Sequence, residues 1–238
     1  MNRAEESLSV ERREALWGKL LAWYAEHRRD LPWRRETDPY AVWISESMLQ
    51  QTRVSTVIPY YERFLERFPS VSALAAAEVD EVLGLWSGLG YYSRARRLHA
   101  AAVQLVEQHG GEFPRERRAA EALPGVGAYT AGAVLSIAYG LEERLVDGNV
   151  QRVLARWFAI EGVVTKAGPR RIIEEMASAL VDGVGDPGSW NQALMELGAT
   201  VCLPQAPSCE DCPVSSECAA KARGLQSVLP ELAAKPTP

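Results

Sequence analysis

Apolar residues recur along this chain at the spacing of a helix, and the alternation typical of strands is almost absent. Three stripes with helical spacing predict amphipathic helices over residues 11–27, 95–106 and 172–180. Six further stretches, separated by prolines and glycines, predict shorter helices: 39–50, 53–67, 115–122, 128–139, 149–159 and 189–199. The pattern therefore predicts an all-α protein of about ten helices.

The length and composition are those of a globular protein. Of 238 residues, 47% are hydrophobic and 24% are charged, which excludes wholesale disorder and collagen-like repeats. The longest nearly unbroken apolar run, 131–141, is too short to cross a bilayer, which takes about 20 residues. Residues 1–14 are rich in Arg and Glu and lack the apolar segment of a secretory signal. We therefore expect a cytoplasmic protein with no membrane partner.

The charge is distributed unevenly. The net charge of −5 argues mildly against nucleic-acid binding, because such domains are often strongly basic. However, residues 91–118 contain six arginines and only three glutamates. From residue 172 onward the chain contains nine acidic residues and only three basic ones. A basic middle is compatible with binding an anion on one face, so the net charge alone decides nothing.

All four cysteines lie within one short segment near the end of the chain. They are Cys202, Cys209, Cys212 and Cys218, with the spacing C-x6-C-x2-C-x5-C. Such clustering in an otherwise cysteine-free chain favours metal binding over disulfides or unrelated buried thiols. The spacing leaves open whether the metal is zinc or an iron–sulfur cluster.

The segment L-P-G-V-G, residues 123–127, lies between two predicted helices. Gly125 and Gly127 allow a tight turn whose backbone N–H groups point outward at the start of the next helix. The segment reads either as a plain helix–helix turn or as an anion site. With the following T-A-G-A it resembles a helix–hairpin–helix, which holds DNA phosphates through backbone amides.

Two carboxylates are candidates for chemistry. On its predicted helix, Glu46 shares a face with Val42 and Leu49, so it is either a solvated edge residue or a partly buried acid with a raised pKa. Asp147 precedes a helix, where it reads as an N-cap or as a carboxylate kept ionised by backbone N–H groups. An acid and a carboxylate are the pair that cleaves glycosidic bonds.

Five motifs occur together in one order: S-E-S-M-L-Q-Q-T (45–52), G-L-G-Y-Y-S-R-A-R (88–96), L-P-G-V-G-A-Y-T-A-G-A (123–133), V-D-G-N-V-Q-R-V-L-A-R (146–156) and the four-cysteine segment. In this combination the chain resembles the MutY-type adenine DNA glycosylases. These belong to the helix–hairpin–helix superfamily that also includes endonuclease III. The resemblance covers about residues 15–224, and it outweighs the simpler interpretation of each motif alone.

The resemblance implies a two-domain helix–hairpin–helix glycosylase fold. A six-helix barrel with the hairpin would span 31–140, an iron–sulfur domain would combine 1–30 with 141–224, and 225–238 would form a tail. The four cysteines would bind a [4Fe–4S] cluster. Relatives usually carry a further nudix-like domain that recognises 8-oxoguanine, whereas here 20 residues follow Cys218, so the chain is either a naturally short member or a part of a larger protein. They also place basic residues in the cysteine loop, whereas 203–208 has none.

The implied substrate is double-stranded DNA that contains adenine mispaired with 8-oxoguanine or guanine. The resemblance implies that Glu46 protonates the flipped-out adenine and that Asp147 stabilises the sugar cation. Asn149 and Tyr129 would hold this site. In the endonuclease III branch a lysine at position 129 forms a Schiff base and nicks the strand, so Tyr129 predicts a monofunctional glycosylase.

Further residues match binding positions of the family. Trp33, Arg34 and Gln192 would line the adenine pocket, and Gln51 and Tyr91 would form a wedge that fills the gap in the duplex. The implied protein is a nucleoid-associated monomer. Two alternatives are a thymine- or uracil-mismatch glycosylase, which also tolerates tyrosine at position 129, and a non-catalytic metal-containing protein that binds DNA damage. The M-L-Q-Q-T segment favours the adenine branch.

Overall fold

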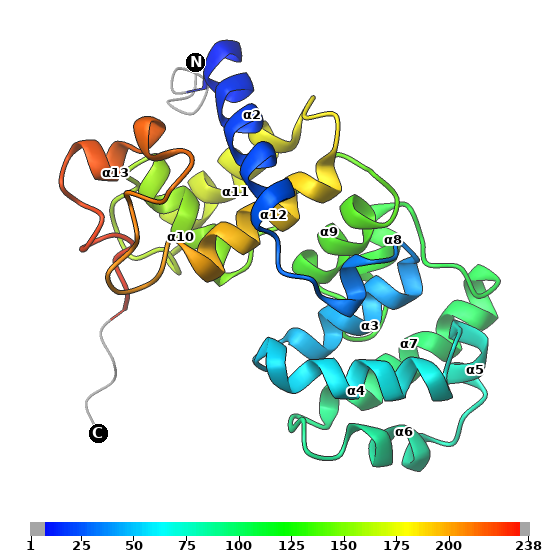
Figure 1. Ribbon diagram of the computed structural model, residues 1–238. Coiled ribbons are helices and arrows are strands. Elements are labelled where there is room, and N and C mark those ends of the chain that lie inside the picture. Colours follow the sequence, from blue (N-terminus) through cyan, green and yellow to red (C-terminus); the bar gives the residue numbers. More distant parts are fainter. Residues whose placement is uncertain (1–7, 234–238) are drawn as a thin grey trace. The chain divides into compact units, whose positions relative to one another are not determined.

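The structure, a computed structural model, describes residues 8–233 (Figure 1). Its regular elements in this range are all helices joined by turns and loops, apart from one isolated bridge between Val163 and Glu231. The predicted all-α class is confirmed. The chain divides into two compact units. One comprises residues 29–141, here the hairpin unit; the other comprises residues up to Arg28 together with those from Glu142 onward, here the cysteine unit. No described helix is long and apolar enough to span a membrane.

The hairpin unit is built around one helix. Its helical elements are η1 (Pro32–Arg34), α3 (Pro39–Leu49), α4 (Val54–Arg67), α5 (Val71–Ala75), α6 (Val79–Trp86), α7 (Ser93–His109), α8 (Arg117–Glu121) and α9 (Ala128–Ile137). Every residue from Tyr40 to Met48 in α3 is buried. A helix that is enclosed on all sides forms the centre of a unit, so its side chains are held in place by packing.

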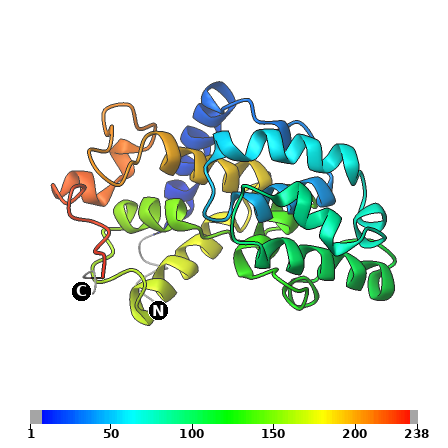
Figure 2. The same ribbon diagram turned by 90° about the horizontal axis from the view of Figure 1, so that it is seen from below.

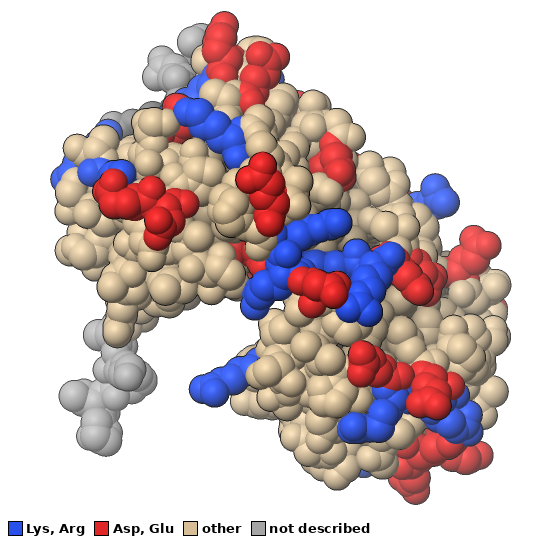
Figure 3. Space-filling view, viewed as in Figure 1, with Lys and Arg blue, Asp and Glu red and all other residues tan. Residues whose placement is uncertain are grey.

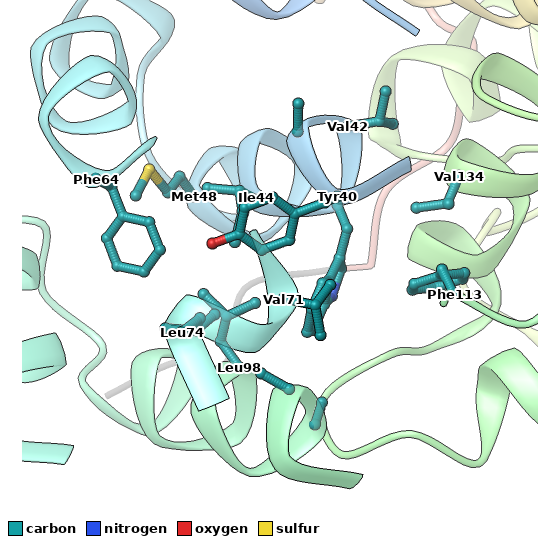
Figure 4. Packing of buried hydrophobic residues seen from close by; sticks show 14 of the residues in the cluster. Tyr40, Val42, Ile44, Met48, Phe64, Val71, Leu74, Leu98, Phe113 and Val134 are labelled. Carbon is teal, nitrogen blue, oxygen red and sulfur yellow. The ribbon is translucent and has the colours of Figure 1, made fainter. Parts of the chain in front are cut away.

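Helix α3 begins at a capping residue, and apolar side chains pack around it. Asp38 caps the helix, because its carboxylate accepts a hydrogen bond from the backbone N–H of Ala41 at 3.1 Å, and Pro39 occupies the first helical position. Figure 4 shows side chains of α3 meeting residues of α4, α5, α7 and α9, among them Phe64, Leu98 and Val134. Glu46 therefore sits on a rigid support.

The cysteine unit contains α2 (Val10–His27), α10 (Gly148–Trp157), α11 (Ala167–Val181), α12 (Pro187–Thr200), η2 (Ser215–Glu217) and α13 (Ala219–Ala222). Helices α2 and α10 both pack on α12, and Trp157 of α10 meets Trp190 of α12 with 6.4 Å between ring centroids. Helix α13, together with the loop before it, lies next to α10 (Figures 1 and 2). Helix α10 thus forms the support of the cysteine loop.

The prediction that residues 225–238 form a tail is wrong for the part that the structure describes. Leu229 is buried and packs with Ala159 and Ala220. Its carbonyl oxygen accepts a hydrogen bond of 2.7 Å from Arg156, and Glu231 accepts one of 2.7 Å from the backbone of Gly162. The resemblance implied a tail here, but these long-range contacts hold the described part of the segment on the unit. Residues 234–238 of the predicted tail lie outside the described residues.

Candidate active site

Glu46 is buried and paired with a tyrosine from the hairpin. It lies on α3 with 4% of its surface exposed, and the hydroxyl of Tyr129, in the first turn of α9, donates a hydrogen bond to its Oε2. A second contact joins the same two helices, because the Gln50 amide donates to the hydroxyl of Thr130 at 3.2 Å. The carboxyl group is therefore held at a defined position, with a donor that can also stabilise its ionised form.

The turn before α9 has the geometry that its two glycines predict. Gly125 has a left-handed backbone, with φ of +79°, and a Cβ atom there would lie 2.9 Å from the Cβ of Arg97. Gly127 caps α9 without a side-chain hydrogen bond. A helix start of this kind presents backbone N–H groups and a partial positive charge to an external acceptor.

Asp147 caps α10 and is held by two donors. Its Oδ1 accepts from the backbone N–H of Val150 at 2.7 Å, and its Oδ2 accepts from the amide of Asn149 at 2.9 Å. Burial nevertheless raises the pKa of Asp147, and these hydrogen bonds only partly oppose the rise. Desolvation is thus the larger effect on this pKa, and the hydrogen bonds from Val150 and Asn149 act in the opposite direction, as the sequence predicts for a helix-capping carboxylate.

Two arginines of α10 connect the Asp147 region with the cysteine loop. Arg152 donates to Asn149 Oδ1 at 2.8 Å and to the Cys202 carbonyl oxygen at 2.7 Å. Arg156, 2% exposed, donates to the Leu203 carbonyl oxygen at 2.7 Å and to the Cys202 Sγ at 3.3 Å. Sequence reasoning assigned neither arginine. Their spacing of three and four residues, starting from Asn149 and extending along one face of α10, is the signal that could have found them.

The four cysteines are free thiols that line one cavity, together with Arg156, Trp157 and Lys221. Burial raises the pKa of the Cys212 thiol to about 11, and the neighbouring cysteines add to this rise. Among the described residues, no group of three or more His, Cys, Asp or Glu side chains is arranged to hold one metal ion. The thiols thus surround a space without converging on a single point.

The three residues predicted to line the adenine pocket belong to both units: Trp33 and Arg34 lie in the hairpin unit, and Gln192 lies in the cysteine unit. Trp33 is buried, with its ring 5.5 Å from that of Tyr61, and the Arg34 guanidinium donates to the Arg29 carbonyl oxygen at 3.2 Å. In the cysteine unit, Gln192 on α12 accepts from the hydroxyl of Tyr24 at 3.2 Å.

Gln51 and Tyr91 are exposed residues of the hairpin unit, and both have a left-handed backbone, with φ of 59° and 50°. Such a backbone is uncommon for residues other than glycine.

Fold and site together define an all-α protein with a helix–hairpin–helix motif and a buried carboxyl group beside the hairpin. Residues 44–179 match the family described as HhH-GPD superfamily base excision DNA repair protein. The chain belongs to this family, which confirms the predicted superfamily.

Individual proteins with known names are similar to this chain over most of its length. The chain is 49% identical over 224 residues to the adenine DNA glycosylase of Homo sapiens, covering 90% of this chain and 41% of that protein. It is 45% identical over 234 residues to the adenine DNA glycosylase of Schizosaccharomyces pombe, covering 90% and 50%. A solved thermostable thymine-DNA glycosylase is 31% identical with a TM-score of 0.80, covering 90% and 98%. The chain thus spans about half the length of the curated relatives it matches.

Proposed function

We propose that this chain is the catalytic part of an adenine DNA glycosylase, which hydrolyses the N-glycosidic bond of adenine mispaired with 8-oxoguanine or guanine. The observation that carries the proposal is the buried pair of Glu46 and Tyr129, placed where α3 meets the hairpin helix. Identity of 45–49% to two adenine DNA glycosylases supports this base over others.

In this proposal Glu46 is the general acid. A carboxyl group removed from water favours its neutral, proton-bearing form, and a flipped-out adenine brings a ring nitrogen to it. Protonation of N7 lets the glycosidic bond break with both electrons moving onto the base. Tyr129 then stabilises the carboxylate that remains, through the hydrogen bond its hydroxyl already donates.

Asp147 is the second carboxylate. When ionised it stabilises the sugar cation formed at C1′, and water adds there, losing a proton that replaces the one given by Glu46. Asn149 holds Asp147 Oδ2 in place. Because position 129 carries a phenol and not an amine, no Schiff base forms with the sugar, and we expect negligible strand cleavage.

We further propose that Cys202, Cys209, Cys212 and Cys218 hold a [4Fe–4S] cluster. Four thiolates on one zinc ion, each about 2.3 Å away, would lie roughly 4 Å from one another. Thiols that surround a cavity suit a larger group of several irons. Bound there, the cluster would supply a cross-link between four positions of the segment from Cys202 to Cys218. Iron content and broad visible absorbance would support it; a colourless protein with stoichiometric zinc would contradict it.

The proposed partner is duplex DNA, bound by a monomer in the cytoplasm. On the face seen in Figure 3, basic and acidic side chains are interspersed. Since the net charge is −5, the backbone N–H groups of the hairpin at Gly125 and Gly127, and not an excess of basic residues, would bind the phosphates.

A single-turnover assay tests the function. Wild type and Glu46→Gln are compared on a duplex with adenine opposite 8-oxoguanine, and breaks are read with and without alkali. We expect wild-type breaks only after alkali, and a rate at least ~10²-fold lower for Glu46→Gln, the scale of losing a general acid. An unchanged rate for the variant would contradict the role of Glu46.

The similarity to a thymine-DNA glycosylase gives the second candidate function, excision of thymine opposite guanine. A parallel duplex with this mismatch belongs in the same assay. Excision of thymine in place of adenine would overturn the proposed substrate, and binding without excision of either base would favour a non-catalytic protein.

A further inference from the structure

Two exposed residues of the hairpin unit have a backbone that their side chains disfavour. Gln51 lies two residues after α3 and Tyr91 lies two residues before α7, with φ of 59° and 50°. A left-handed backbone at a non-glycine residue persists only where the surrounding structure holds it. Contacts from neighbouring groups must therefore hold these two turns.

One guanidinium reaches both turns. Arg94, in the first turn of α7, donates to backbone and hydroxyl oxygens on either side of Gln51: the carbonyl oxygens of Ser47 (3.1 Å), Met48 (3.0 Å) and Gln50, and the hydroxyl of Thr52 (3.1 Å). Ser47 and Met48 lie in the last turn of α3, whose carbonyl groups have no partner within the helix, and Gln50 is the C-cap. Arg94 thus satisfies the end of α3 and fixes the backbone that carries Gln51.

The same guanidinium also borders the second turn. Its Nη2 donates to the Gly90 carbonyl oxygen at 3.4 Å, and its Cζ lies 5.3 Å from the centre of the Tyr91 ring. On the other side it lies 5.4 Å from the Trp86 ring, and the Trp86 indole N–H donates to the same Gly90 oxygen at 3.1 Å. Tyr91 is nevertheless 60% exposed.

We propose that Arg94 is a positioning residue that sets Gln51 and Tyr91 together as one rigid element for insertion into the duplex. This rests on the proposed action on a base in duplex DNA. An arginine suits the task because its planar group carries five donors in a fixed fork, whereas the ammonium group of lysine has three donors at one point. Holding both residues before DNA arrives avoids ordering them during base flipping.

The test compares Arg94→Met and Arg94→Lys with Arg67→Gln, a control that removes one surface charge of the same unit outside the Arg94 contacts. A duplex with 2-aminopurine at the target position reports unstacking by fluorescence, and it is read whether or not excision occurs. We expect both Arg94 variants to reduce the fluorescence rise and to lower the excision rate at saturating protein by about 10- to 100-fold, the scale of a misplacement near 1 Å. The control should match wild type.

Two further measurements separate positioning from general folding damage. Thr52→Val removes one acceptor of the guanidinium and leaves its carbonyl acceptors in place, so we expect a smaller loss in the same direction. In a Tyr91→Ala background, Arg94→Met should add less than its full effect, because both changes disable one element. Fully additive losses, rescue by lysine, or a wild-type fluorescence rise in Arg94→Met would overturn the inference. Loss of excision in wild type with a normal fluorescence rise would instead overturn the proposed function.

Discussion

Helices α9 and α10 begin with nearly the same backbone conformation but with opposite chemistry. The cap residue of α9 is Gly127, with φ of −100° and ψ of −177°, and that of α10 is Asp147, with φ of −100° and ψ of −174°. Asp147 fills the start of α10 with its own carboxylate, which accepts from the backbone N–H of Val150. Gly127 has no side chain, so the backbone N–H groups at the start of α9 have no side-chain acceptor on their cap residue.

The difference shows how one local geometry serves two tasks. An empty helix start attracts an anion from outside, whereas a filled one presents a fixed negative charge. A Cβ added at Gly127 would meet no atom within 4 Å, so the start of α9 is open. The start of α10 is packed, because a Cβ added at Gly198 of α12 would lie 2.6 Å from the Cβ of Asn149. Under the proposed function, the open start of α9 would receive a DNA phosphate, and the packed start of α10 would position Asp147 for catalysis.

The largest expected effect comes from neutralising the cap of α10. Asparagine caps helices about as well as aspartate, so Asp147→Asn should keep the helix while removing the charge. We expect the single-turnover excision rate to fall at least ~10²-fold, with DNA affinity near that of wild type. Retained excision would show that the filled cap of α10 has only a structural task.

The substitution Gly198→Ala tests the packing of α12 against the start of α10. The added methyl group overlaps the Asn149 Cβ, so α10 and α12 must shift apart locally, at a cost of about 1–3 kcal/mol in the free energy of unfolding. Because Asn149 holds Asp147, we also expect slower excision. Urea unfolding and the excision assay check both effects, and unchanged stability would mean that this helix contact is looser than described. Gly18→Ala is a matched control, since a Cβ there meets nothing within 4 Å.

A carboxylate introduced at Gly127 tests whether the open start of α9 binds a phosphate. Gly127→Asp should give α9 the cap that α10 has, and DNA affinity should fall about tenfold through repulsion of phosphate, while the free energy of unfolding holds or rises. Gly127→Ala, which adds volume without charge, is the matched control. Binding measured over a range of salt concentrations should show a shallower salt dependence for the aspartate variant. Equal affinities for the two variants would argue against a phosphate at this helix start.

The smallest expected effect concerns pH. Burial raises the folded-state pKa of Asp147 above its ordinary value of 3.8, so the unfolded chain releases this proton more readily than the folded one. Ionised Asp147 therefore destabilises the fold at pH above its raised pKa, and this penalty disappears as pH falls below 3.8. The stability of Asp147→Asn relative to wild type should increase with pH through this window, as urea unfolding at several pH values would show. A constant difference would contradict the raised pKa.

The sequence predicted the helical class and the longer helices, since these depend on periodic patterns within one segment. It did not predict the short helices α5 and α6, although it did predict the equally short α8 within 115–122. Helices of one or two turns give little periodic signal, so their prediction depends on the turn residues around them. It assigned residues from 225 to a tail, although Leu229 is buried, because the contacts of Leu229 with Ala159 come from a distant part of the chain. It also gave no role to Arg94, whose acceptors are mostly backbone oxygens and leave no pattern of residue types.

The sequence by itself determined what is local: the caps of the helices, the glycine turn of the hairpin, and four cysteines close enough in the chain to share one group. Only the tertiary structure decided which polar groups are buried and what they meet. Glu46 and Tyr129 lie 83 positions apart, and Arg156 and Leu229 lie 73 apart, yet each pair is joined by a hydrogen bond. The physical reason is that desolvation and hydrogen bonding depend on every segment packed around a group, whereas a sequence pattern records only its neighbours along the chain.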